Sequence, residues 1–400
     1  MKICDLTQAY NPTSGGIRTY IEAKRAYIAG RTDWEHLLIV PGETDRRVSL
    51  GRLTRYEIQS PKLPAAADYR LLLRLRRVAQ ILEAERPDLI ELACPYQLPL
   101  VALFHRLRFG TAVVGYYHTD VPIAYVEAPL HRMAGGLCAS MARWSAERYL
   151  RSLYNQFDAT MVGSQALAER LSAIGFHDPV VTPLGIDAET FAPHRRDLAL
   201  RERIGGSGTR EILIYAGRLD DEKQVWLLVE ALSHLKARPG LRLVMVGNGP
   251  LRGALQRWGQ TDPRLVLLPY RSDKRDLAAL LASADLYVTA GPFETFGLSV
   301  LEAQAAGLPV VGVDAGALRD RVDATVGRLV PPGDSRAMAE AIGALLDSDR
   351  SEMARNARRR AESHSWTATF DLLAEVYQRC VTLGSAAGVP GVEACAPLEA

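Results

Sequence analysis

The segment 287–311, YVTAGPFETFGLSVLEAQAAGLPVV, carries two carboxylates in surroundings that favour a sugar nucleotide. Glu294 lies in a Gly-Pro loop, and Glu302 lies inside a helix that we expect to begin near Phe296 and Gly297. The first turn of such a helix offers unpaired N–H groups and the positive end of the helix dipole, which suit a phosphate. Glu302, more than a turn later, can accept hydrogen bonds from ribose hydroxyls, and Glu294 from a second sugar. The alternative is that both are solvated carboxylates on an amphipathic helix.

Two cations flank the turn that follows another apolar strand. The strand 211–216 (EILIYA) leads into GRLDDEK, which contains Arg218 and Lys223. Both side chains can converge on one anionic group, Arg as a planar fork and Lys as a compact charge. As isolated basic residues they would more often be solvated surface charges. A later turn, GNGP, contains Gly247 and Gly249, which allow a sharp turn or a close approach of the backbone to a ligand.

A histidine ends a strand in the first half of the chain. The predicted strand 112–117 runs into YYHTD, so His118 lies at its carboxyl end. In parallel sheets this is the edge at which ligands bind. A buried, hydrogen-bonded structural histidine is the alternative interpretation.

A glycine-rich turn joins the first predicted strand, 2–6, to the first helix. Gly15 and Gly16 close this turn, NPTSGG at 11–16, where the backbone can approach a phosphate or a sugar. A Gly-Gly pair alone is more often a plain tight turn. The dinucleotide fingerprint G-x-G-x-x-G is absent from the turn, which counts against a nicotinamide-dependent oxidoreductase.

Strands and helices alternate along the chain, which predicts parallel sheets and an α/β fold. The run VVTPLGID at 180–187 breaks a strand with Pro and Gly, and the polar stretch 192–208 follows it. We therefore place a domain boundary near Gly185.

Composition limits the class of protein. The 400 residues are enough for two or three domains, with 48% hydrophobic and 24% charged residues. A net charge of +2 argues against nucleic acid as a partner. The five cysteines are scattered without metal-ligand spacing, which favours reduced thiols in the cytoplasm. We expect neither a signal peptide nor a membrane span, because no apolar stretch approaches about 20 residues.

These motifs resemble those of one enzyme family. GPFETFGLSVLEAQAAGLPVV looks like the E-x7-E signature of the retaining GT-B glycosyltransferases of family four (glycosyl transferases group 1). The GP-x-ETFG-L run is especially similar to the bacterial α-mannosyltransferase branch. GRL-x-x-EK matches the family's diphosphate clamp, and HTD its strand-end histidine. One departure is Gln224, which stands where family members often carry Gly.

The resemblance implies a GT-B fold, with two Rossmann-like domains whose parallel sheets face each other across a cleft. It implies an acceptor-side domain at 1–185, a linker at 186–208, a nucleotide-sugar domain at 209–364 and a helix at 365–383 that crosses back to the first domain. The remaining tail, 384–400, is rich in Gly, Ala and Pro and is expected to be disordered.

Residue roles follow from the resemblance in the same way. The implied catalytic residues are His118, Arg218, Lys223 and Glu294. The implied donor-binding residues are Gly15, Gly16, Arg218, Lys223, Gly247, Gly249, Glu294, Phe296, Gly297, Leu298 and Glu302. Tyr117 and Asp120 are weaker candidates for acceptor contact. No metal or cofactor is expected, because two cations and the helix amides would neutralise the leaving diphosphate.

The implied reaction transfers a hexosyl group from a nucleoside-diphosphate sugar to a hydroxyl, with retention at the anomeric carbon. GDP-mannose is the leading donor and a lipid or lipid-linked glycan the leading acceptor. The alternative is a UDP-glucose-type enzyme acting on a soluble sugar or small molecule, and a non-catalytic sugar-nucleotide binder is less favoured. A phosphorylase would need a pyridoxal lysine, and no motif marks one.

A basic, leucine-rich stretch bears on the acceptor. We expect a helix at 68–85 whose arginines alternate with leucines, as in RLLLRLRRV at 70–78. Such a helix could lie on an anionic membrane, which would place the protein peripherally on the cytoplasmic face. The alternative, a buried leucine face with solvated arginines, is equally compatible with the sequence.

Overall fold

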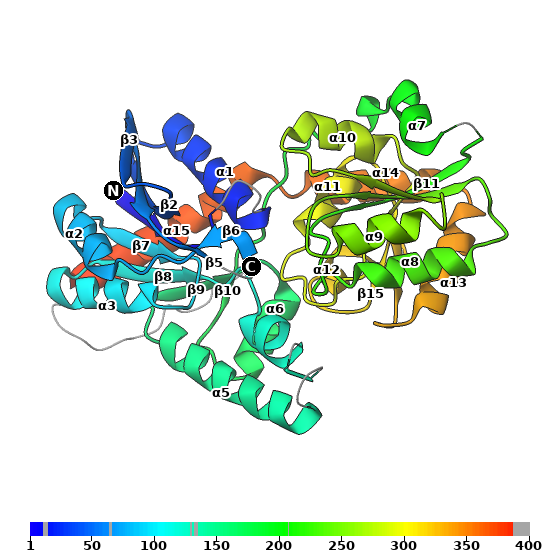
Figure 1. Cartoon of the computed structure of the whole chain (residues 1–400). Helices are drawn as coiled ribbons and strands as arrows, with labels where there is room; N and C mark the ends of the chain where they lie inside the picture. Colours follow the sequence, from blue (N-terminus) through cyan, green and yellow to red (C-terminus); the bar gives the residue numbers. More distant parts are fainter. Residues whose placement is uncertain (11–14, 64–65, 129, 132–134, 207, 387–400) are drawn as a thin grey trace. The chain divides into compact units, whose positions relative to one another are not determined.

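The computed structural model describes residues 1–10, 15–63, 66–128, 130–131, 135–206 and 208–386. The chain divides into two compact units, and each is described by itself (Figure 1). Unit 1 comprises Met1–Pro183 together with the segment that begins at Trp366, and unit 2 comprises Leu184–Ser365. The predicted loop residues 11–14 and the tail residues 387–400 lie outside the described part of the chain.

Unit 1 contains an eight-stranded sheet in the order β10-β9-β8-β7-β1-β2-β4-β3. Its strands are β1 Lys2–Leu6, β2 Glu35–Gly42, β3 Arg46–Leu50, β4 Leu53–Gln59, β7 Leu89–Leu92, β8 Ala112–Tyr116, β9 Ala159–Val162 and β10 Val180–Val181. All pairs are parallel except β3 with β4, so the sheet is mixed rather than wholly parallel as expected. Short strands β5 (Lys62–Leu63) and β6 (Ala66–Arg70) form a separate antiparallel pair.

Helices cover both faces of this sheet. They are α1 Gly16–Arg31, α2 Leu75–Glu85, α3 Leu98–Phe109, the π-helix η1 Pro122–Glu127, α5 Gly136–Tyr154, α6 Gln165–Ala173 and α15 Trp366–Ala386. One apolar cluster joins the sheet to α2, α3, α5 and α6, which therefore share a face. Helices α1 and α15 pack against each other, as the aromatic contacts of Tyr20 and Tyr27 with Phe370 show. Successive right-handed crossovers that advance in one direction along a parallel sheet lie on one face. This explains why α2, α3, α5 and α6 cover the same face.

The predicted helix at 68–85 is wrong in its first half. Residues 66–70 form β6, and the helix begins only at Leu75. Leu72 is fully buried in the core, while Arg70 pairs with Glu43 at 2.5 Å and Arg74 with Asp45 at 2.7 Å. The chain leaves the helical path because Leu72 enters the core. The paired arginines do not form a continuous basic helix face.

Unit 2 contains a six-stranded, wholly parallel sheet in the order β13-β12-β11-β14-β15-β16. The strands are β11 Glu211–Ala216, β12 Leu241–Val246, β13 Leu265–Leu268, β14 Leu286–Val288, β15 Val310–Val313 and β16 Gly327–Val330. Buried runs such as EILIYA and LRLVMV are typical of strands covered on both faces. This order is the doubly wound arrangement, whose switch point lies between β11 and β14.

The helices of unit 2 follow its strands in alternation. They are the 3-10 helix η2 Pro193–Arg195, α7 Leu198–Gly205, α8 Val225–His234, α9 Arg252–Gly259, α10 Lys274–Ala282, α11 Leu298–Ala305, α12 Leu318–Arg321, α13 Ser335–Leu346 and α14 Ser351–Glu362.

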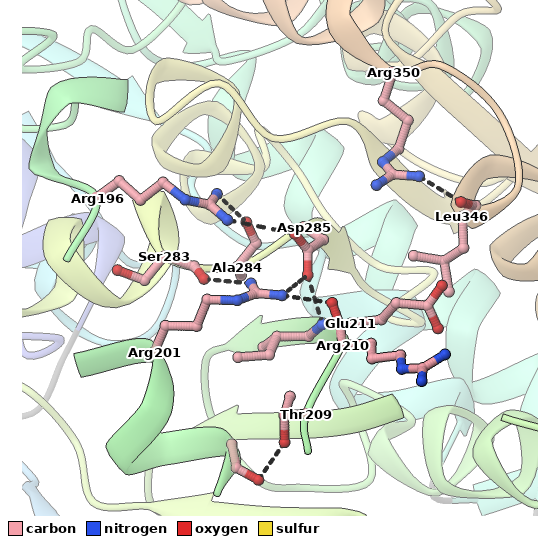
Figure 2. A network of polar contacts seen from close by, with 12 residues as sticks. Arg196, Arg201, Thr209, Arg210, Glu211, Ser283, Ala284, Asp285, Leu346 and Arg350 are labelled. Carbon is pink, nitrogen blue, oxygen red and sulfur yellow. Dashed lines mark hydrogen bonds and ion pairs between the residues drawn. The ribbon is translucent and has the colours of Figure 1, made fainter. Parts of the chain in front are cut away.

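The segment 186–208, which the sequence assigns to a linker, contains η2 and α7 and is tied to unit 2 by an ionic network. Figure 2 shows Arg196 and Arg201 directed at the turn before β14. Arg201 donates to the Ser283 carbonyl at 2.8 Å and pairs with Asp285 at 2.7 Å. The same Asp285 carboxylate accepts the Ile212 N–H at 2.7 Å. These contacts lie at the amino ends of β11 and β14, opposite the edge that carries the candidate site.

Candidate functional site

The doubly wound sheet of unit 2 brings two of the predicted motifs to one edge. Strands β11 and β14 are parallel neighbours, with Leu213 opposite Leu286 and Ile214 opposite Tyr287. The turn 217–223 leaves the carboxyl end of β11, and the loop 289–297 leaves the carboxyl end of β14. Both therefore extend from the switch point, where ligands of doubly wound sheets bind.

A lysine–glutamate contact joins the turn to the loop. Lys223 Nζ lies 2.6 Å from Glu294 Oε1 and 3.5 Å from Glu222 Oε1. Burial acts to lower the pKa of Lys223, but the charges of Glu294 and Glu222 outweigh burial and raise the pKa above its usual value. Gly291 fits closely against this lysine, since a Cβ there would lie 3.2 Å from the Lys223 Cδ. Lys223 is therefore charged and held in place.

Arg218 lies in the same turn and is more accessible, with 39% of its side chain exposed. Its guanidinium contacts Asp220 at 2.6 Å and also pairs with Glu222. The Tyr215 hydroxyl donates to the Arg218 carbonyl at 2.7 Å and fixes the turn. Carboxylates thus hold both predicted cations, and a diphosphate bound here must compete with these carboxylates.

Gly297 sets the start of α11. It has φ of 80°, a left-handed conformation that favours glycine, and it occupies the N-cap position before Leu298. Phe296 is buried beside it. The first N–H groups of α11 therefore lie at the end of the loop 289–297. The Lys223–Glu294 contact joins this loop to the turn 217–223.

A buried arginine that the sequence did not reveal supports this helix start. Arg321, on α12, donates to the Phe296 carbonyl at 3.1 Å, and its guanidinium lies 4.0 Å from the centre of the Phe296 ring. The Arg321 guanidinium also contacts the His364 ring, at 2.6 Å. Gly316 approaches the Glu294 carbonyl so closely that a Cβ would lie 2.5 Å from that oxygen. No local motif marks Arg321, because its partners are distant in sequence.

Glu302 lies on α11, beyond its first turn, and is half-buried. Burial raises the pKa of Glu302 to about 7, against the opposing charge of Lys274. At neutral pH this carboxyl group is therefore divided between its neutral and ionised forms. It can donate a hydrogen bond as well as accept one.

Gly247 and Gly249 have a structural explanation within unit 2. A Cβ on Gly247 would lie 1.9 Å from the Gly217 carbonyl oxygen, and one on Gly249 would lie 2.3 Å from that of Leu219. The Leu219 N–H donates to the Asn248 carbonyl at 2.9 Å. These two glycines therefore allow their backbone to pack closely against the turn 217–223, which carries the two cations, and they fix the backbone of that turn.

In unit 1, Gly15 and Gly16 lie at the start of α1, after β1. A Cβ at either position would meet no heavy atom of the described residues within 4 Å. Packing against the described chain therefore does not require glycine here. This is compatible with the ligand-binding turn that the sequence predicts.

His118 lies two residues after β8. Its ring stacks on Tyr116, with centroids 4.2 Å apart, and meets the edge of Tyr20 at 5.1 Å. Burial, assisted by the charge of Lys24, lowers the pKa of His118 to about 3. The imidazole is therefore neutral at physiological pH. It can hydrogen-bond to a sugar hydroxyl but does not supply positive charge.

Tyr117 and Asp120 contact each other rather than open space. The Tyr117 hydroxyl lies 3.3 Å from Asp120 Oδ1, and Arg170 lies 3.0 Å from Asp120 Oδ2. Both residues are buried, and the Tyr117 ring packs against Tyr154 and Phe176. This geometry favours a structural role for both.

An ionic cluster beneath His118 was not anticipated from the sequence. Lys24 Nζ, almost fully buried on α1, lies 2.8 Å from Asp5 Oδ1 and 2.9 Å from Glu91 Oε1. Tyr20 and Tyr377 both donate to Glu91. The cluster thus joins α15 to β1 and β7 within unit 1. A lysine on the apolar face of α1 was the one available signal.

The described residues contain no group of three or more His, Cys, Asp or Glu side chains placed to hold a metal ion. Within the same part of the chain, every helix is too short or too polar to cross a bilayer.

Solved structures of glycosyltransferases share this fold. Sucrose-phosphate synthase from Thermosynechococcus elongatus matches with a TM-score of 0.77 at 19% identity, over 96% of this chain and 99% of that one. The Anabaena protein HepE, in complex with UDP and glucose, matches with a TM-score of 0.71 at 20% identity, over 94% and 99%. The two-domain α/β architecture is thus that of the GT-B glycosyltransferases, as predicted.

Family models and relatives agree with the fold. Residues 14–190 match Glycosyltransferase Family 4, and residues 210–348 match Glycosyl transferases group 1. A GDP-mannose-dependent α-(1-6)-phosphatidylinositol dimannoside mannosyltransferase of Mycobacterium tuberculosis is 32% identical over 375 residues, covering 92% of this chain and 93% of the relative. A GDP-mannose-dependent α-mannosyltransferase of Corynebacterium glutamicum is 28% identical over 394 residues, covering 96% and 90%. The chain belongs to family 4 of the glycosyltransferases, and it is a glycosyltransferase enzyme.

Proposed function

We propose that this glycosyltransferase moves a mannosyl group from GDP-mannose to a hydroxyl of a lipid or lipid-linked glycan, with retention at the anomeric carbon. The observation that carries the proposal is the Lys223–Glu294 contact at 2.6 Å, which joins the cation-bearing turn to the loop before α11. Relatives named as GDP-mannose-dependent mannosyltransferases support the donor, and one named for a phosphatidylinositol dimannoside supports the lipid acceptor.

The proposed chemistry needs charge stabilisation at the leaving diphosphate. Arg218, Lys223 and the first N–H groups of α11 would bind its oxygens, and their fixed positions lower the cost of reorganisation during the reaction. Arg218 would exchange Asp220 and Glu222 for phosphate, since it is the more accessible cation. The proposed reaction uses neither metal nor cofactor, and the nucleotide sugar is a substrate.

The remaining residues have proposed roles around the sugar. Glu302 would hydrogen-bond the ribose, and Glu294 would hold hydroxyls of the donor sugar. Neutral His118 would orient the sugar through a hydrogen bond. The acceptor hydroxyl would attack the anomeric carbon from the side of the leaving group, the bond to the diphosphate oxygen would break, and the diphosphate would take the hydroxyl proton.

The proposed location follows from the proposed acceptor. Transfer to a lipid requires peripheral contact with a membrane, and a nucleotide-sugar donor is supplied on its cytoplasmic side. We therefore place the enzyme at the inner face of the plasma membrane.

A thermal-shift titration with GDP and UDP tests the donor. A nucleotide bound only by the folded protein stabilises it by about 2.7 kcal/mol at a concentration of 100 Kd. For a domain of 150–250 residues this corresponds to roughly 5–10 °C in Tm. We expect the larger shift with GDP. A larger shift with UDP would contradict GDP-mannose as the donor, and no shift with either nucleotide would contradict the proposed site.

A further inference from the structure

Helices α3 and α5 of unit 1 expose apolar side chains on the faces that point away from the sheet. On α3 the exposed residues Leu100, Phe104 and Leu107 have helical spacing, and Leu107 is 81% exposed. On α5 the corresponding pair is Leu137, 79% exposed, and Trp144, 62% exposed. A helix that covers a sheet normally turns a polar face to solvent, so these two stripes are unusual.

The two stripes lie on the same side of the sheet and are joined. Both helices pack onto the apolar cluster described above, through Leu98 and Ala102 of α3 and Leu150 and Leu153 of α5. The Tyr149 hydroxyl on α5 lies 3.3 Å from the Pro95 carbonyl, just before α3. Both helices are labelled in Figure 1.

We call the resulting surface the α3–α5 patch. It consists of Tyr96, Leu100, Phe104, Leu107, Leu137, Met141, Trp144 and Tyr149, all of which are exposed. Soluble monomers rarely expose contiguous apolar patches larger than a few hundred Å², and larger ones mark interaction surfaces.

The charges around the patch indicate which partner it fits. Over 96–110 and 136–152, the exposed charged residues are Arg148 and Arg108, of which Arg108 pairs with Glu83, and no exposed residue in these stretches is acidic. Arg148 also lies 5.8 Å from the centre of the Trp144 ring. Leucine, methionine and aromatic side chains bordered by arginine are typical of surfaces that rest in the headgroup region of an anionic bilayer.

We infer that the α3–α5 patch docks the enzyme on an anionic phospholipid bilayer. The α3–α5 patch lies outside the helix predicted at 68–85, in which Arg70 and Arg74 are paired with Glu43 and Asp45. This inference rests on the proposed lipid acceptor, whereas its test measures binding alone.

Vesicle flotation with the full chain tests the inference. We expect the protein to float with vesicles of phosphatidylglycerol and phosphatidylcholine, and far less with phosphatidylcholine alone. The double substitution Met141→Ser/Trp144→Ser should lower the vesicle-bound fraction by about tenfold or more. Arg148→Ser should reduce the preference for phosphatidylglycerol by about fivefold. Phe104→Ser provides a second variant, on the other helix.

The matched control is Leu198→Ser on α7 of unit 2, because Leu198 is also strongly exposed, at 71%. It should bind vesicles like the unchanged protein. The GDP-induced shift in Tm, measured for each variant, reports whether the fold and the proposed donor site are intact. Failure of the unchanged protein to float while it still binds GDP would overturn the docking inference but leave the proposed function. Equal flotation of all variants would also overturn it, as would a dimer in sedimentation that Met141→Ser/Trp144→Ser dissociates.

Discussion

Replacing Lys223 with Ala removes the cation at the centre of the proposed diphosphate site. The lysine lies 2.6 Å from Glu294 and 3.5 Å from Glu222, so its loss leaves two carboxylates facing the position proposed for the phosphates. A hydrogen bond between charged groups contributes about 1.5–3 kcal/mol. Repulsion from the unpaired carboxylates adds on the order of 1 kcal/mol at a partly screened site.

Together these terms predict a loss of roughly 2.5–4 kcal/mol of transition-state stabilisation, or about 10²–10³ in kcat/KM. The assay follows GDP release from GDP-mannose with a lipid acceptor extract. Lys223→Arg, which keeps the charge, should retain more activity than Lys223→Ala. Lys236→Ala is the matched control, since Lys236 is an exposed lysine just beyond the other end of α8. A change of less than about threefold for Lys223→Ala, with an unchanged Tm, would refute this reasoning.

Three further substitutions test stability by thermal or denaturant unfolding. Gln224 has φ of 47°, a left-handed conformation that costs non-glycine residues about 1 kcal/mol. Gln224→Gly should therefore keep or raise Tm, and a clear drop would contradict strain at this position. Burial raises the pKa of Glu302 to about 7, so the folded state binds more protons than the unfolded state and stability should fall as pH rises from about 4.5 to 7. In Glu302→Gln, the free energy of unfolding should fall less over this pH range, by on the order of 1–3 kcal/mol. A pH dependence unchanged from that of the original protein would count against the raised pKa. Tyr377→Phe should cost about 1–3 kcal/mol, because it removes a donor to the buried carboxylate of Glu91. Tyr27→Phe, which loses an exposed bond to Asp371, should cost less, and equal costs would argue against the buried cluster as the main attachment of α15.

The sequence predicted those parts of the fold that depend on local patterns. Apolar runs such as 211–216 and 241–246 identified buried parallel strands, and Gly297 identified the start of α11. The two strand-end motifs could be placed together because neighbouring parallel strands present their carboxyl ends at one edge.

Features that depend on distant contacts could not be predicted in the same way. The stretch 68–74 has a helical composition, but burial of Leu72 and the pairing of Arg70 and Arg74 override it. The support of Phe296 by Arg321, and the proximity of Lys24 to His118, arise only when elements far apart in sequence pack together. The neutral state of His118 likewise follows from its burial, which the sequence does not give.

Gln224 shows how a departure from a family pattern becomes intelligible in three dimensions. Its left-handed conformation at the N-cap of α8 is one that glycine adopts more readily than glutamine, which fits the Gly that the family pattern has at this position. The helix still begins at the next residue, and Lys223 keeps its contact with Glu294. The substitution therefore costs stability without moving the cation.

A crystal structure of the protein with GDP tests the proposed site most directly. Phosphate oxygens should lie within hydrogen-bond distance, about 2.7–3.2 Å, of Lys223 Nζ and of the backbone N–H groups at the start of α11. Arg218 should have turned from Asp220 towards the diphosphate. Phosphates bound away from both the 217–223 turn and the tip of α11 would contradict the proposal that these two elements form one diphosphate site.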